Sequence, residues 1–182
     1  MAPKRYRRAP QVTCLPRSSL DFQAYPAVDA ALKDLKGHAR KLQSLVVAQG
    51  EEMQLLERLY YKGKNQHRSA LFWSRLEEVR KYGKRLQELE PFNLMELLRC
   101  SFFGAAVVEN PKSMKGPWTH YPDGRCILFV MERLSSCSLL LEKTRIQLSE
   151  AYQFFCLSMQ SGYFVQLVLT IVAITSRLDS LA

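Results

Sequence analysis

The sequence is poor in the residues from which metal centres and disulfide frameworks are built. Its 182 residues include three His and five Cys, and no two cysteines lie within a few residues of each other. The odd number of cysteines also argues against a complete set of disulfides. We interpret them as free thiols, small core residues of a protein in a reducing compartment, and we expect neither a metal ion nor a cofactor.

Motifs of the common enzyme classes are missing as well. There is no glycine-rich phosphate loop, no nucleophile elbow and no paired Cys or His motif. Carboxylates such as Asp34 and Glu77 stand near basic residues at helical spacing, where ion pairing is their usual role. We therefore expect a protein without catalytic activity of its own.

Acidic residues are absent from the first 20 positions, which contain five Lys or Arg and three Pro. This composition predicts a flexible basic arm over residues 1–21. Its role would be that of a solvated terminus, a phosphate-binding tail or a nuclear localisation signal. The segment lacks the apolar run of a secretory signal. The whole chain carries a formal charge of +9, so RNA, DNA, an anionic membrane or an acidic protein are its expected partners.

Strand patterns are absent, and helical spacing dominates instead. Apolar residues recur at intervals of three and four over residues 26–62, which predicts either one bent helix or two helices. A further helix is expected from about residue 66 to Glu90, where Pro91 ends it. A short helix over residues 93–103 follows.

A long loop opens the second half of the chain. Residues 104–122 are rich in Gly and Pro and lack periodicity, which predicts a loop of unusual length. Helical patterning resumes over residues 127–148 and continues as an apolar stretch to about Arg177. These elements predict a single all-α domain over residues 22–182, a helical bundle of five or six helices that follows the flexible basic arm.

Charge is absent from residues 151–176, which are strongly apolar. By length alone this stretch could cross a bilayer, so a membrane-associated helical protein is one interpretation. Gln and Ser residues interrupt the stretch, however, and its continuous apolar part, residues 165–174, is too short to span. We favour a helix that is buried on most sides within the bundle.

Positive charge is concentrated between Arg58 and Arg85, where nine basic residues stand against two acidic ones. Such a cluster favours phosphate binding, because Lys and Arg displace the counterions around a polyanion. On the helix after the turn, Trp73, Arg80 and Lys84 project to a face other than the apolar one. An exposed indole there would stack on an unpaired base, whereas a Trp that packs against another helix would be structural.

The segment around this turn resembles a known family. The run LLERLYYKGKNQHR at residues 55–68, followed by Phe72 and Trp73, is similar to the RNase MRP protein subunit family. The closing run TSRL at residues 175–178 is similar to the end of the N-terminal domain in the related animal family, the nucleolus and neural progenitor proteins. Animal members continue past this point with a long basic extension, so the chain is expected to be either a complete protein or that domain alone.

The resemblance implies a nuclear, nucleolar, non-catalytic subunit of a ribonucleoprotein endoribonuclease that cleaves precursor ribosomal RNA, with the RNA component as catalyst. Its implied partners are structured RNA of the RNase MRP type and other protein subunits of the particle, with no membrane. The alternative is a protein-interaction scaffold in a nuclear particle that makes no RNA contact. From the motif and the clustered charge, the predicted RNA-binding residues are Lys62, Lys64, Asn65, Gln66, His67, Arg68, Trp73, Arg75, Arg80, Lys81, Lys84 and Arg85.

Overall fold

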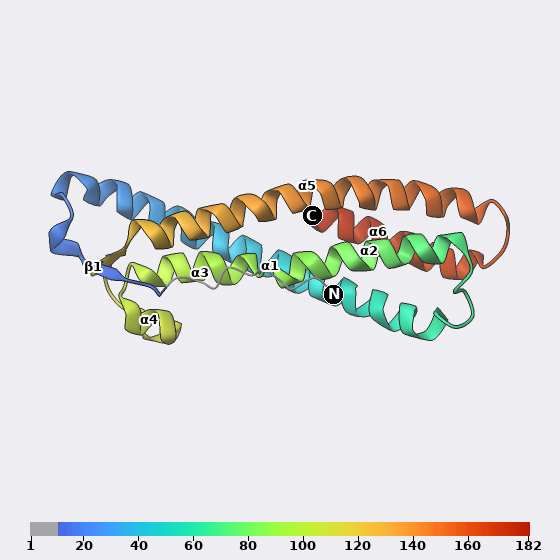
Figure 1. The fold of residues 1–182 in the computed structure, drawn as a ribbon, viewed down its shortest axis with the longest axis horizontal. Helices are drawn as coiled ribbons and strands as arrows, with labels where there is room; N and C mark the ends of the chain where they lie inside the picture. The colour runs from blue at the N-terminus through green and yellow to red at the C-terminus, as the bar shows by residue number, and fades with distance from the viewer. Residues whose placement is uncertain (1–10) are drawn as a thin grey trace. The chain divides into compact units, whose positions relative to one another are not determined.

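The computed structural model describes residues 11–182, and most of these residues are helical (Figure 1). The expected all-α bundle is therefore confirmed, with five longer α-helices and one short one in the described residues. The elements in chain order, with η for a 3-10 turn, are β1 (Cys14–Pro16), η1 (Arg17–Ser19), η2 (Phe22–Ala24), α1 (Tyr25–Gly63), α2 (Leu71–Glu88), α3 (Pro91–Ser101), α4 (Ala105–Glu109), η3 (Pro111–Ser113), β2 (His120–Pro122), α5 (Gly124–Met159) and α6 (Val165–Leu181).

Internal contacts divide the chain into two compact units, and each unit combines two separate stretches of sequence. Among the described residues, unit 1 comprises residues 11–41 together with Pro91–Ser135. Unit 2 comprises Leu42–Glu90 and Ser136–Ala182. The helices α1 and α5 therefore contribute residues to both units.

Unit 1 contains a small antiparallel sheet, which the sequence patterns did not predict. The strands β1 and β2 pair with Leu15 opposite Tyr121. Strands of three residues are too short to show alternation, and their pairing joins segments about a hundred residues apart in the chain. The predicted flexible arm is thus wrong over residues 14–21, which form β1, η1 and the cap of η2, and residues 1–10 lie outside the described part of the chain.

An aromatic cluster holds unit 1 together around Trp118. The guanidinium carbon of Arg17 lies 4.3 Å from the ring centre of Tyr25 and 4.2 Å from that of Trp118. The indole N–H of Trp118 donates to Asp29 Oδ1 at 2.8 Å. The predicted loop over residues 104–122 is therefore largely structured, since it contains α4, η3 and β2, and its buried Trp118 anchors it.

Unit 2 is built from the second half of α1, α2, the second half of α5, and α6, which lie side by side in Figure 1. Each helix supplies at least one fully buried side chain to the common core, and the largest of these are Leu56, Leu76, Phe155 and Ile171. The amphipathic spacing read from the sequence places these residues on the inner faces of their helices. Their burial removes apolar surface from water, which is the main stabilising contribution to such a bundle.

The uncharged stretch 151–176 does not form one buried helix. It is interrupted after Met159 by a turn in which Gly162 has a φ of +75° and Phe164 a φ of +56°. Leu157 and Leu169 on either side of the turn are 63% and 56% exposed. The prediction of a mostly buried helix is wrong here, because apolar side chains occur on all sides of α5 and α6 and those on the outer sides are exposed. Within the described chain, no helix combines the length and hydropathy required to cross a membrane.

The five cysteines are all free thiols. Cys100, Cys126 and Cys137 are buried, and burial raises the pKa of each of these thiols. A buried thiol with a raised pKa stays protonated near neutral pH and is a poor nucleophile. In residues 11–182, no group of three or more His, Cys, Asp or Glu side chains is placed to hold a metal ion.

Candidate functional site

The basic segment predicted from the sequence centres on the connection between α1 and α2 in unit 2. The helix α1 ends at Gly63, and the backbone N–H groups of Gln66 and His67 donate to the carbonyl of Gly63 at 3.1 and 3.0 Å. The Trp73 ring packs directly over Gly63, since a Cβ at this position would lie 2.4 Å from Cη2 of the ring. Only glycine leaves room for the ring, so the close packing and the helix end occur at the same residue.

His67 is buried beneath this turn. Its ring centre lies 5.5 Å from that of Trp73, 5.6 Å from that of Phe72 and 4.6 Å from that of Phe164, the last in an edge-on arrangement. The side chain is 8% exposed, so its role in the fold is to join the α1–α2 turn to the α5–α6 turn. A direct contact of His67 with an external ligand would require this packing to open.

Trp73, for which the sequence left both an exposed indole and a packed one open, is 3% exposed. Its ring stacks on Tyr60 of α1, with ring centres 5.4 Å apart and an angle of 16° between the planes. Of the two interpretations of Trp73, the one in which it packs against another helix is therefore correct, and the exposed indole among cations is ruled out. Trp73 is buried because α1 covers the face of α2 that carries it.

Two cations of α2 converge on a carboxylate of α1. Arg80 Nε lies 2.6 Å and Lys84 Nζ 3.0 Å from the same oxygen of Glu57. Partial burial alone would raise the pKa of Glu57, but the hydrogen bonds from Arg80 and Lys84 outweigh it and the pKa is lowered. Arg80 also lies over the Tyr60 ring, 4.3 Å from its centre. Arg80 and Lys84 are thus engaged within unit 2.

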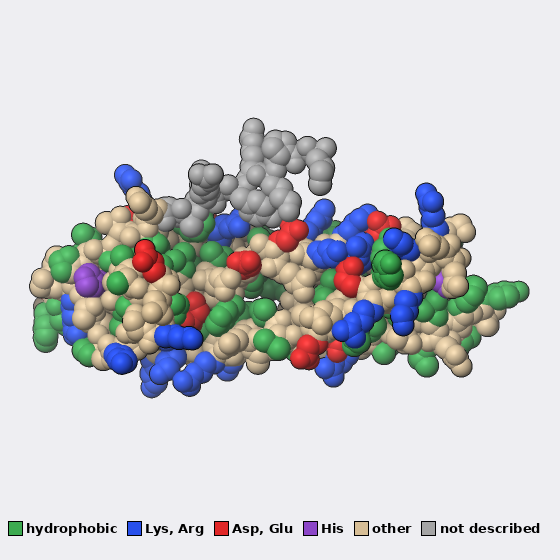
Figure 2. Space-filling model, turned by 90° about the horizontal axis from the view of Figure 1, so that it is seen from below, with side chains coloured by type: hydrophobic (Ala, Val, Ile, Leu, Met, Phe, Trp, Pro, Cys, Tyr) green, Lys and Arg blue, Asp and Glu red, His purple; other side chains and the backbone are tan. Residues whose placement is uncertain are grey.

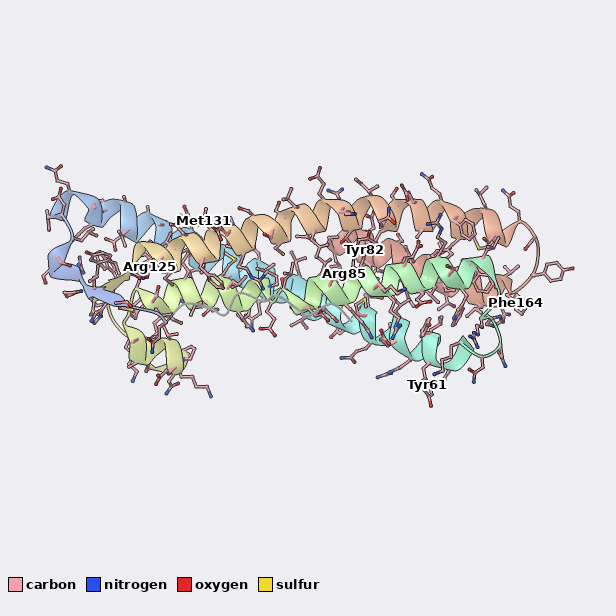
Figure 3. The ribbon with its side chains drawn as sticks, viewed as in Figure 1. Tyr61, Tyr82, Arg85, Arg125, Met131 and Phe164 are labelled. Carbon is pink, nitrogen blue, oxygen red and sulfur yellow. The ribbon has the colours of Figure 1, made fainter. Side chains whose placement is uncertain are left out.

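The remaining cations of α2 are more exposed. Arg75 pairs with Glu78 at 2.8 Å and Lys81 with Glu77 at 3.1 Å, and the side chains of both pairs are between 40% and 59% exposed. Exposed pairs of this kind are worth about 0–1 kcal/mol, so an approaching phosphate can compete for their cations. Arg85 extends along α2 with its guanidinium 5.6 Å from the Tyr82 ring centre, and both residues are labelled in Figure 3.

The cations of the turn itself are different. Among the described residues, Arg58, Lys62, Lys64 and Arg68 have no carboxylate oxygen within 4 Å, and all four are exposed. We call these four residues the basic turn. Asn65 and Gln66, also predicted as site residues, lie between them and are exposed. Figure 2 shows this contrast over unit 2, where many blue cations stand beside red carboxylates and others stand alone.

Exposed aromatic residues next to the basic turn were not predicted. Tyr61 and Tyr163 are 74% and 75% exposed, and Phe164 is 55% exposed. Figure 3 shows Tyr61, on the last turn of α1, and Phe164, on the connection between α5 and α6, towards the same end of unit 2, with the Tyr61 side chain directed away from Phe164. The exposure of Tyr163 and Phe164 could have been predicted from Gly162 in the uncharged stretch, since a glycine before two aromatic residues favours a turn over a continuous helix.

Phe164 adopts a left-handed backbone conformation with a φ of +56° and a ψ of +30°. For a residue other than glycine this conformation costs about 1–2 kcal/mol. Its ring contacts with His67 and Phe72 compensate part of that cost, because aromatic pairs contribute about 0.5–1.5 kcal/mol each. The contacts hold the ring in place while more than half of the residue remains in solvent.

The fold and the site together define a basic helical-bundle protein with a surface of cations and aromatic rings at one end of unit 2. The chain belongs to the nucleolus and neural progenitor protein family, because the model of the N-terminal region of that family matches residues 13–182. The resemblance to that family seen in the sequence is thereby confirmed. Searches among curated proteins and among solved structures gave no significant match.

Proposed function

We propose that this protein is a non-catalytic RNA-binding subunit of a nucleolar ribonucleoprotein endoribonuclease of the RNase MRP type, which acts in precursor ribosomal RNA processing. The observation that carries the proposal is the basic turn, with four exposed cations and no carboxylate within 4 Å of them in the described residues. The name of the family refers to the nucleolus, which supports a nucleolar location. Its partners would be a structured RNA and the other proteins of the particle.

The mode of binding follows from the kinds of side chain available. Lys and Arg on a convex turn contact phosphates and define how an RNA lies on the surface, without reading its sequence. Each phosphate contact releases condensed counterions, so the affinity should fall steeply with salt. We expect Lys62, Lys64 and Arg68 to contribute most, and Arg80 and Lys84 least, because Glu57 already holds the latter two.

The test is a titration of structured RNA at several salt concentrations with a variant that combines Lys62→Gln, Lys64→Gln and Arg68→Gln. We expect weaker binding and a log–log salt slope that is smaller by about 2–3, since each lost phosphate contact removes roughly 0.7–0.9. The matched control combines Lys33→Gln, Lys36→Gln and Arg40→Gln, three exposed cations of unit 1 with the same total charge. If both variants lose the same slope, binding depends on net charge alone and the proposed surface is wrong.

A second candidate function is a scaffold for other proteins, and one observation favours it. Leu139, Ile146 and Leu157 on α5 are 69%, 54% and 63% exposed, and their spacing of seven and eleven residues places them along one side of the helix. Glu142 and Glu150 lie beside this row and line an open groove of about 810 Å³. A partner helix with apolar residues between Lys or Arg would suit the row. Replacing Leu139 and Leu157 by Gln should then prevent assembly with protein partners and leave RNA affinity unchanged.

A further inference from the structure

The two turns at one end of unit 2 form a single surface. The connection between α1 and α2 and the connection between α5 and α6 meet through His67 and Phe164, whose ring centres are 4.6 Å apart. Phe72 extends the contact, with its ring centre 6.2 Å from that of Phe164. Residues almost a hundred positions apart in the sequence are therefore held next to each other by buried aromatic packing.

This surface exposes aromatic rings, while aromatic rings of the same region are buried below it. We use the name aromatic tip for Tyr61, Tyr163 and Phe164, which are between 55% and 75% exposed. Trp73 and His67 beneath them are 3% and 8% exposed. Tyr163 and Phe164 are adjacent, and Tyr61 lies towards the same end of unit 2. Large rings that remain in water near one end of a folded unit mark interaction sites.

The charge around the aromatic tip has one sign. Residues 58–76 and 151–176, which include both turns, contain no Asp or Glu. The first of these stretches contains Lys62, Lys64 and Arg68, and the ammonium of Lys64 lies 5.3 Å from the ring centre of Tyr61. A ligand suited to this surface has negative charges that alternate with flat rings or apolar groups.

We propose that the aromatic tip binds unpaired nucleotides of RNA, with bases stacked on Tyr61, Tyr163 and Phe164 and phosphates held by the cations of the basic turn. Stacking of bases on aromatic side chains beside cations is the general way in which proteins bind single strands. The strained backbone of Phe164 supports this assignment, because residues held in such conformations cluster at binding sites.

An anionic bilayer is the rival ligand, since exposed rings next to Lys and Arg also suit a membrane interface. The exposed amides of Asn65 and Gln66 favour RNA, because they lie within the basic turn and are costly to place in hydrocarbon. The same amides can form hydrogen bonds with the edges of unpaired bases. This inference rests on the proposed RNA-binding function and adds the kind of RNA that is bound.

The experiment compares a short single-stranded oligoadenylate with a blunt RNA duplex of the same length, by fluorescence anisotropy. For the double variant Tyr61→Leu, Tyr163→Leu we expect single-strand affinity to fall roughly tenfold or more, because each stacked base contributes severalfold to affinity, and duplex affinity to stay unchanged. The matched control is Phe22→Leu, an exposed ring of unit 1 at 78% exposure, which should bind both RNAs as the unaltered protein does.

Phe164 needs a separate variant, since its backbone conformation restricts the residues that fit. Phe164→Asn retains a residue that tolerates the left-handed region and removes the ring. Because it also removes the ring contacts with His67 and Phe72, circular dichroism of this variant must match that of the unaltered protein before its RNA affinity is compared. The variant Tyr61→Trp should keep single-strand affinity and show an indole emission that the oligoadenylate quenches. The native Trp73 and Trp118 are buried at 3% and 2% exposure, so the new signal comes from the tip.

The possible failures can be told apart. If the Leu variants bind the single strand like the unaltered protein while the Gln variant of the basic turn still loses RNA affinity, the stacking inference is wrong and the proposed function stands. If the basic-turn variant also binds normally, both are wrong. If the Leu variants instead lose flotation with phosphatidylserine vesicles and keep their RNA affinity, the tip is a membrane contact and the inference is overturned.

Discussion

Each of the two units contains one of the two tryptophans of this protein, and the two indoles have different partners. Both are buried, and both lie among other aromatic rings. In unit 1, Trp118 packs against Arg17 and donates its N–H to Asp29, so the face and the N–H of the indole both have partners. In unit 2, the buried N–H of Trp73 has no acceptor among the described residues, and the cations of the nearby turn extend into solvent.

This difference separates a structural cluster from a surface that is available for binding. Arg17, which is enclosed between two rings and donates to the carbonyl of Trp118, contributes to stability but cannot also hold a phosphate. The exposed cations of the basic turn contribute little to the fold, and they are the ones that an anionic ligand can reach. Within a chain of high net charge, the arrangement of partners around each cation therefore matters more than the number of cations.

The largest expected effect comes from making the same substitution in both units. Trp118→Phe and Trp73→Phe remove the same ring volume, so the difference between them reports the indole N–H. We expect Trp118→Phe to lower the free energy of unfolding by about 1.5–3 kcal/mol more, because it alone breaks a hydrogen bond to a charged group. Urea unfolding of both variants measures this. An equal or larger loss at Trp73 would mean that its N–H has an acceptor in solution.

The residues at which helices begin and end were predictable from the sequence. Which side chains of neighbouring helices contact each other was not. Gly63 ends α1 and Pro91 begins α3, and both follow from the backbone preferences of single residues. The helical period separates the side of α2 that carries Trp73 from the side that carries Phe72, but it does not show that Tyr60 covers Trp73. Burial depends on neighbours that are distant in the sequence.

Contacts between residues distant in the sequence also explain why the sequence did not reveal that part of the positive charge on α2 is neutralised. Glu57 precedes the basic segment by one residue, yet it pairs with Arg80 and Lys84, which are more than twenty positions away. A count of charges along the chain does not detect this pairing, and the predicted surface on α2 is therefore weaker than the number of cations suggested. In the described part of the chain, the basic turn depends on no such distant partner, because its cations lie close together in the sequence, and all four are exposed in the structure.

A second test uses two glycines that lie against side chains of different stiffness. In Gly63→Ala the new Cβ meets the rigid Trp73 ring at 2.4 Å, and in Gly83→Ala it meets the flexible Met53 at 2.3 Å from Sδ. We expect Gly63→Ala to destabilise unit 2 by about 1–2 kcal/mol through overpacking. Gly83→Ala should stay within about 1 kcal/mol of the unaltered protein, since Met53 can move and Ala favours the helix.

Thermal unfolding followed by circular dichroism distinguishes the two glycine variants. The comparison is internal, because both substitutions add one methyl group next to a buried side chain of unit 2. Similar losses for both variants would show that Met53 is as constrained as the Trp73 ring. A lower RNA affinity of folded Gly63→Ala would further connect the packing of Trp73 to the position of the basic turn.

The smallest expected effect concerns the pH dependence of the Glu57 cluster. Because the hydrogen bonds from Arg80 and Lys84 lower the pKa of Glu57 in the folded protein, its ion pairs stabilise the fold above the unfolded pKa of about 4 and lose this effect as the pH falls through the folded value. Glu57→Gln should therefore cost about 1 kcal/mol or less at pH 7, and the difference should disappear in acid. Glu77→Gln, which removes a more exposed pair, is the control and should change stability by only a few tenths of a kcal/mol. If Glu57→Gln is equally destabilised at every pH, the side chain acts through packing, and Arg80 and Lys84 would then remain available to bind RNA.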